Sequence, residues 1–138
     1  MPDSSLFIAH IIFSTKGWQP IITSYLMEEI IDRLKRNFES KDSQLLLARG
    51  REEHIHILGR FTEDIPFSRI IGWSKGECSH WINEKYPDLH FYWQKGFWYE
   101  MVEENELNDV ADYINNQETI HQDITFQEEI TRFRKELE

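Results

Sequence analysis

The stretch QLLLARGREEHIHILGRF, residues 44–61, decides the fold class of this chain. It contains two runs of strand-forming residues, over residues 44–48 and 54–61, which are joined by a short charged link. The second run alternates isoleucine with histidine, which is the pattern of a strand whose two faces meet different surroundings. The two runs therefore predict an antiparallel pair of strands.

Strand and helix patterns flank this pair on both sides. Before it, an Ile- and Phe-rich run over residues 5–14 predicts a buried strand, and apolar spacing over residues 23–38 predicts a helix. After it, a second helical pattern begins at Pro66, and an aromatic run over residues 89–94 predicts a short strand. The order β-α-β-β-α-β predicts the α+β, ferredoxin-like split βαβ fold: an antiparallel sheet with two helices on one face.

Two more helices are expected toward the C-terminus. One spans residues 106–118, and the other spans residues 125–138, where Thr125 and Glu128 have capping-box spacing. We expect residues 1–138 to form a single domain with residues 125–138 as a helical tail. Because the ferredoxin-like fold hosts many functions, the function must be inferred from a site.

Composition narrows the class of protein. Among 138 residues, 40% are hydrophobic and 14% aromatic, which is enough for a packed core and excludes intrinsic disorder. The single cysteine, Cys78, excludes an internal disulfide and an all-cysteine metal site, and fits a reducing compartment. The N-terminus is acidic and the longest apolar run is too short to cross a membrane, so we expect a cytoplasmic protein.

The charge of the chain is uneven. The net charge is −10, from 15 basic and 25 acidic residues, and such a charge by itself disfavours binding to phosphate-rich nucleic acid. Residues 1–60 are neutral, however, so the whole deficit lies after residue 60. Residues 96–131 contain ten acids and no Lys or Arg, a run that is most often a solvated helix face.

The histidine pair is the first candidate for chemistry. His54 and His56 are two residues apart, so on a strand they project from the same face. Two imidazoles on a rigid strand make half of a divalent metal site. The alternative is a chance pair on a solvent face, since the chain has six histidines.

A tyrosine and a glutamine form the second candidate. Tyr113 and Gln117 are four residues apart and share one face of the expected helix. A phenol is a candidate nucleophile, and an amide oxygen can serve as a third, hard metal ligand. The alternative is a half-buried tyrosine at a helix–sheet interface.

These motifs together resemble a known family. The resemblance follows the chain in order through HIIFSTKGWQPII (10–22), EHIHIL (53–58), SKGECSHWIN (74–83), FYWQKGF (91–97) and YINNQETIHQDITFQEE (113–129). The chain resembles the single-tyrosine HUH transposases of the smallest bacterial insertion sequences, especially the subgroup associated with repetitive extragenic palindromes (REP).

The resemblance implies cleavage and rejoining of single-stranded DNA that carries palindromic hairpins. It implies that His54, His56 and Gln117 bind Mg²⁺ or Mn²⁺. Tyr113 would be the nucleophile and would form a 5′-phosphotyrosine. A phenol with a pKa of about 10 is a weak nucleophile at neutral pH, so help from a cation is expected.

Further residues are candidates for DNA contact. Basic residues near predicted strand ends could follow a backbone, and aromatic residues in predicted loops could stack on unpaired bases. The candidates are Lys16, Trp18, Arg49, Arg51, Lys75, Trp98 and His121. For Lys75 the alternative is a solvated lysine. Insertion-sequence relatives act as dimers and REP-associated relatives as monomers, and we expect a homodimer.

One segment departs from the family pattern. Relatives have a small, flexible stretch before the tyrosine helix, whereas this chain reads FWYEMVEENEL over residues 97–107. This segment and the acids around Tyr113 raise a second hypothesis, a catalytically silent DNA-hairpin-binding protein derived from a transposase. A third is a ferredoxin-like domain whose acidic face binds a protein.

Overall fold

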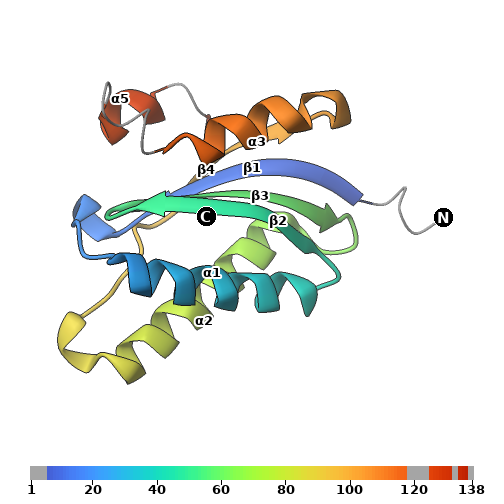
Figure 1. The fold of residues 1–138 in the computed structure, drawn as a ribbon. Coiled ribbons are helices and arrows are strands. Elements are labelled where there is room, and N and C mark those ends of the chain that lie inside the picture. Colours follow the sequence, from blue (N-terminus) through green and yellow to red (C-terminus); the bar gives the residue numbers. More distant parts are fainter. Residues whose placement is uncertain (1–5, 118–124, 132–133, 137–138) are drawn as a thin grey trace.

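A five-stranded antiparallel sheet forms the centre of the protein (Figure 1). The computed structural model describes residues 6–117, 125–131 and 134–136. The strands are β1 (Leu6–Ser14), β2 (Gln44–Arg51), β3 (His54–Thr62), β4 (Phe97–Val102) and β5 (Arg134–Glu136). Their spatial order is β2-β3-β1-β4-β5. The first four strands have the predicted ferredoxin-like order, and β5 adds a short strand at the β4 edge.

Helices cover both faces of the sheet. The helices are α1 (Ser24–Glu39), α2 (Phe67–Lys85), α3 (Leu107–Asn115) and α5 (Phe126–Ile130), with short 3₁₀ helices at Lys16–Trp18, Pro87–Leu89 and Glu104–Glu106. Figure 1 shows α1 and α2 side by side on one face and α3 and α5 on the other. The prediction of two helices on one face is confirmed. Within the described residues, no helix is both long and apolar enough to cross a bilayer.

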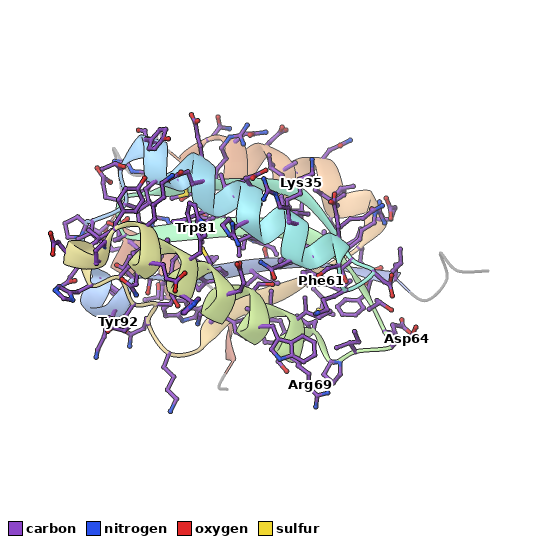
Figure 2. All side chains as sticks on the ribbon, turned by 90° about the horizontal axis from the view of Figure 1, so that it is seen from below. Lys35, Phe61, Asp64, Arg69, Trp81 and Tyr92 are labelled. Atoms are coloured by element: carbon purple, nitrogen blue, oxygen red, sulfur yellow. The ribbon has the colours of Figure 1, made fainter. Side chains whose placement is uncertain are left out.

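The α1/α2 face of the sheet carries the main core. Ile55, Ile57 and Phe61 of β3 point to this face and are fully buried. Trp81 lies between α1 and α2 (Figure 2), where the Arg33 guanidinium is 4.7 Å from its ring centre. Because strand side chains alternate, the intervening histidines of β3 must face α3 and α5.

The predicted strand over residues 89–94 is wrong. The fourth strand is β4, and the preceding segment forms an isolated bridge between Trp93 and Thr15. Backbone hydrogen bonds beside it join Gln94 to Ser14 and Lys16 to Tyr92, and side chains of α2 also hold the same segment. The Asn83 amide exchanges two hydrogen bonds of 2.7 Å with the backbone of Phe91. The Lys75 ammonium donates to the carbonyls of Gln94 and Gly96 at 2.9 and 2.7 Å. The aromatic run therefore meets the end of β1 at one bridge and does not form a strand of its own, and the polar contacts from α2 hold the rest of its backbone.

The two C-terminal helices also differ from their predicted ranges. α3 ends at Asn115, before the predicted end at 118, and residues 118–124 lie outside the described part. The helix expected over 125–138 begins as predicted, with Thr125 and Glu128 forming the capping box, but ends at Ile130. Residues 134–136 then pair with β4 as β5, because the edge of β4 offers backbone partners.

Candidate active site

Strands β1 and β3 bring three histidines onto the face covered by α3 and α5. His10 of β1 and His54 and His56 of β3 have no exposed surface. Antiparallel pairing places Ile12 opposite His56 and Ser14 opposite His54, which sets His10 and His56 on a diagonal between the strands. The predicted histidine pair therefore belongs to a buried cluster and does not lie on a solvent face.

Partners on the outer ring nitrogens orient both imidazoles. His54 Nδ1 lies 2.7 Å from Glu53 Oε1. His56 Nδ1 lies 2.8 Å from His10 Nε2, and His10 Nδ1 lies 3.0 Å from Glu100 Oε2. When Nδ1–H of His54 donates to Glu53, and Nδ1–H of His56 donates to His10, the Nε2 atoms of His54 and His56 present lone pairs to the interior. His10 in turn donates its Nδ1–H to Glu100. Such outer partners fix the tautomer of metal-binding histidines.

The last turn of α3 supplies Tyr113, and Gln117 follows two residues after the helix ends. Gln117 is buried, and its Oε1 lies 3.0 Å from His54 Nε2. Tyr113 is half-buried, and its ring lies 5.9 Å from that of His56 between centroids. The structure thus brings together the four residues His54, His56, Tyr113 and Gln117, which come from two elements far apart in the sequence.

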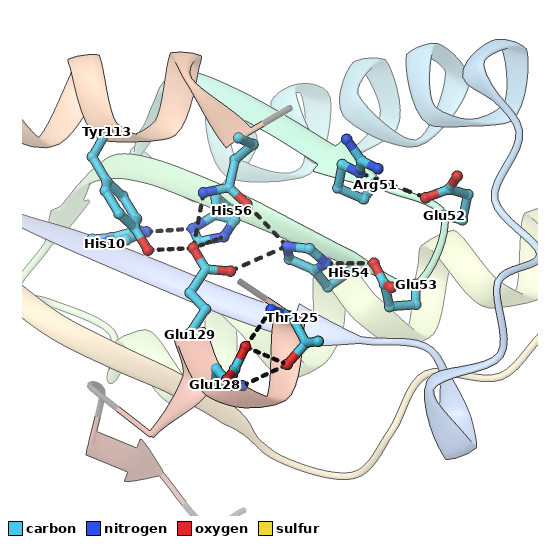
Figure 3. A network of polar contacts seen from close by, with 11 residues as sticks. His10, Arg51, Glu52, Glu53, His54, His56, Tyr113, Thr125, Glu128 and Glu129 are labelled. Atoms are coloured by element: carbon cyan, nitrogen blue, oxygen red, sulfur yellow. Dashed lines mark hydrogen bonds and ion pairs between the residues drawn. The ribbon is translucent and has the colours of Figure 1, made fainter. Parts of the chain in front are cut away.

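A fifth residue, Glu129 of α5, lies at the centre of this group (Figure 3). The hydroxyl of Tyr113 donates to Glu129 Oε2, and Gln117 Nε2 donates to the same oxygen at 2.9 Å. Glu129 Oε2 is 3.3 Å from His56 Nε2, and Oε1 is 3.6 Å from His54 Nε2. Glu129 has no exposed surface.

The sequence contained a signal for Glu129. The capping box places the start of α5, and Phe126 is three residues before Glu129 on the same helical side. Phe126 and Ile130 pack on Ile12 and Trp98, so this side of α5 faces the sheet. Its helical position places Glu129 on the side of Phe126, and a carboxylate that is buried there needs partners. We counted Glu129 only as one acid of a solvated run.

Burial sets the protonation states in this cluster. Burial lowers the pKa of His56 to about 3, so its imidazole is neutral. Burial acts to raise the pKa of Glu129, but its polar contacts, which include the hydrogen bonds donated by Tyr113 and Gln117, outweigh it and keep the pKa below its usual range. A neutral imidazole and an ionised carboxylate are the forms in which these groups bind metal.

The cluster fits a divalent cation. One ligand atom from each of His54, His56 and Glu129 lies within 4.8 Å of the others. His56 Nε2 is buried and forms no hydrogen bond of regular geometry within the described residues. Imidazole nitrogens combined with amide and carboxylate oxygens form a donor set suited to Mn²⁺ or, with more oxygen ligands, Mg²⁺.

Two of the predicted DNA contacts line a groove beside the cluster. The groove has a volume of about 790 Å³ and is bounded by Arg49 and Arg51 of β2, the N-terminal end of α1, and Gln117. Lys16 is exposed in the 3₁₀ helix that follows β1. Trp18, in the same turn, packs on Phe126 with ring centroids 5.1 Å apart.

The remaining candidates lie elsewhere. Lys75 is buried on α2, across the sheet from the cluster, and its ammonium holds backbone carbonyls. Trp98 was expected in a loop, but it is a buried residue of β4 beneath Phe126. His121 lies outside the described residues.

Similarity to known proteins identifies the family. The sequence profile described as "Transposase IS200 like" matches residues 3–117. The chain belongs to the family of IS200-like transposases. Its relatives include the transposases for insertion sequence element IS200 of Salmonella typhimurium and Salmonella typhi. Each is 26% identical over 114 residues, covering 78% of this chain and 74% of the relative.

Solved structures share the fold of this IS200-like transposase. A transposase candidate from Deinococcus radiodurans R1 superposes with a TM-score of 0.66 and 18% identity, covering 81% of this chain and 91% of that one. A REP-associated tyrosine transposase bound to a REP hairpin gives a TM-score of 0.68 and 14% identity, covering 91% and 80%. The family match establishes a DNA-processing transposase family, and the two structures establish the fold.

Proposed function

We propose that this chain cleaves and rejoins single-stranded DNA, with Tyr113 as the nucleophile. The observation that carries the proposal is the convergence of the Tyr113 hydroxyl and the His54 and His56 Nε2 atoms on one carboxylate, that of Glu129. A nucleophile beside a set of metal-binding groups is the arrangement that metal-assisted phosphoryl transfer requires.

His54, His56 and Gln117 would hold Mg²⁺ or Mn²⁺. A bound divalent cation supplies polarisation of the scissile phosphate and offsets its negative charge. The chain itself prepares the nucleophile, because the Glu129 carboxylate accepts a hydrogen bond from the Tyr113 hydroxyl. This acceptor fixes the position of the phenol oxygen and draws electron density onto it.

The reaction exchanges one phosphate ester for another. The Tyr113 oxygen forms a bond to phosphorus, the bond from phosphorus to the 3′-oxygen breaks, and the tyrosine proton ends on that 3′-oxygen. The products are a 5′-phosphotyrosine and a free 3′-hydroxyl. An incoming 3′-hydroxyl reverses the exchange, and because the ester is conserved on Tyr113, rejoining needs no ATP.

The proposed partner is single-stranded DNA with a palindromic hairpin. The REP-associated tyrosine transposase with the same fold is bound to a REP hairpin. Here Gln117 lines the same groove as Arg49 and Arg51, so a strand bound in it would lie next to a proposed metal ligand. Tyr113 meets the histidines of its own chain, so we propose that one chain suffices and that a homodimer is not required.

A covalent-adduct assay tests the function. Wild-type protein with Mn²⁺ and single-stranded hairpins from the DNA flanking its gene should give a protein–DNA adduct that survives denaturation. Tyr113→Phe should give none, whereas Tyr92→Phe, a change at an exposed tyrosine, should behave as wild type. Tight hairpin binding without an adduct would instead favour the catalytically silent alternative.

Mixing two inactive variants tests whether one chain suffices. Tyr113→Phe combined with His56→Ala should remain inactive if each site is built from a single chain. Recovery of the adduct in the mixture would show that a tyrosine helix serves the histidines of a second copy.

A further inference from the structure

The C-terminal helix α5 delivers a carboxylate to the proposed metal ligands. Its capping box begins the helix at Thr125, and Phe126 and Ile130 dock it on Ile12 and Trp98. Ring stacking of Phe126 on His54, with centroids 4.0 Å apart, joins this docking directly to the histidine pair. Glu129 is therefore held in place by packing on both sides of it in the helix.

The two acids of α5 have opposite environments. Glu128 is exposed and completes the capping box, whereas Glu129 has no exposed surface. Burial of an ionised carboxylate costs several kcal/mol unless charged or hydrogen-bonding groups compensate. The neighbours of Glu129 are the same groups that would hold the cation, so a cation at that point would supply the compensation.

The distances in the cluster match ligand spacing around one ion. Bond lengths of roughly 2.0–2.2 Å from a cation to nitrogen or oxygen place adjacent ligand atoms about 3.0 Å apart in a near-octahedral sphere. Glu129 Oε2 lies 3.3 Å from His56 Nε2, Glu129 Oε1 lies 3.6 Å from His54 Nε2, and Gln117 Oε1 lies 3.0 Å from His54 Nε2. One ligand atom from each of His54, His56 and Glu129 lies within 4.8 Å of the others, and Gln117 contacts both His54 and Glu129.

We infer that Glu129 is a fourth protein ligand of the divalent cation, supplied by the C-terminal segment. This inference rests on the proposed function, since it concerns the same metal site. His54, His56 and Gln117 are neutral as ligands, so Glu129 is the one negatively charged ligand among the four and offsets part of the charge of the ion. The family profile ends at residue 117, so this ligand comes from outside the region that defines the family.

Docking of α5 and metal binding are then one coupled event. A metal-bound Glu129 keeps α5 on the sheet, and a docked α5 raises the affinity of the site for the ion. Because Glu129 also accepts the hydrogen bond of Tyr113, the segment that completes the metal site also positions the nucleophile.

Titration of Mn²⁺ into chelator-treated full-length protein tests the inference without using activity. Isothermal calorimetry should show Mn²⁺ affinity reduced about 10- to 100-fold in Glu129→Gln. Glu128→Gln removes the same charge from the adjacent position and keeps a capping side chain, so its affinity should stay within about twofold of wild type. Thermal unfolding in chelator would confirm that both variants are folded.

Three results would overturn the inference in distinguishable ways. Equal affinity in Glu129→Gln and Glu128→Gln would remove Glu129 from the site and leave the proposed function intact. Tighter Mn²⁺ binding and faster adduct formation in Glu129→Gln would mean that the carboxylate occupies the place of a DNA phosphate. Absence of Mn²⁺ binding in wild type, or undiminished binding in His56→Ala, would reject the proposed metal site together with the inference.

Discussion

The two faces of the sheet bury different kinds of side chain. Alternate residues of β3 supply both: Ile55, Ile57 and Phe61 enter the α1/α2 face, and His54 and His56 enter the α3/α5 face. The first face is filled mainly by aliphatic and aromatic side chains, with Ser74, Lys75 and Cys78 of α2 also buried there. The second holds a polar cluster between two small apolar groups, one around Leu58 and Ile114 and one around Trp98 and Phe126.

One face therefore supplies the stability of the fold, and the other carries the groups proposed for chemistry. The apolar face gains stability in proportion to the area that it removes from water, whereas buried imidazoles and carboxylates contribute little net stability and tend to lower it unless paired. The same strands therefore hold the polar face rigid while the apolar face stabilises them. A site on strands is positioned more accurately than one on loops.

Phe61→Ala should produce the largest effect, and it should lower the stability of the fold without changing metal affinity. Phe61 is fully buried and its ring contacts those of Phe7, Phe38 and Phe67. Removing it should reduce the free energy of unfolding by about 3–5 kcal/mol in urea denaturation. Exposed Leu46→Ala should change it by less than about 0.5 kcal/mol.

A loss of metal affinity in Phe61→Ala would contradict the separation of stability on one face from metal binding on the other. Folded Phe61→Ala should bind Mn²⁺ within about twofold of wild type, because an apolar cavity on the opposite face leaves the imidazoles oriented by Glu53 and His10. A tenfold loss in the folded fraction would mean that packing on one face sets the geometry of the other.

The sequence predicted the apolar face better than the polar face, for a physical reason. Apolar periodicity is local, so the ranges of β1, α1 and β3 and the start of α2 were predicted within one or two residues. The fourth strand was misplaced because its neighbour at residues 89–94 is aromatic yet fixed by Asn83 and Lys75 of another element. Contacts between distant elements leave no periodic pattern in the sequence.

The residues of the polar cluster also divide into those with a local sequence pattern and those joined only by contacts between distant elements. His54, His56, Tyr113 and Gln117 were found because each pair shares a face within one element. Glu129 and the Glu100–His10 link to His56 were missed, since they exist only after β1, β3, β4 and α5 meet. The role of a buried acid cannot be assigned before its partners are known.

His10→Leu should have an intermediate effect, and it should lower the affinity of the polar cluster for metal. The substitution removes the group that orients His56 through its Nδ1. We expect Mn²⁺ affinity to fall about 10- to 100-fold, the usual cost of losing an outer partner of a metal ligand. His10→Gln keeps an acceptor for His56 and should recover part of the affinity, whereas exposed His80→Gln should have no effect. Unchanged affinity in His10→Leu would show that packing alone orients His56.

The smallest predicted effect is the dependence of stability on pH, and it distinguishes a buried neutral imidazole from an exposed one. Burial lowers the pKa of His56 to about 3, below the value near 6.5 expected in the unfolded chain. Near pH 6 the His56 imidazole therefore binds a proton in the unfolded state and does not bind one in the folded state. Acidification through pH 6.5 consequently favours unfolding. In chelator, this difference should remove about 1 kcal/mol from the free energy of unfolding between pH 7 and pH 5.5. This window lies above the range in which carboxylates titrate, so Glu129 does not contribute to the slope. In His56→Gln that share of the slope should vanish, and equal slopes in both proteins would mean that His56 keeps an ordinary pKa in the folded state.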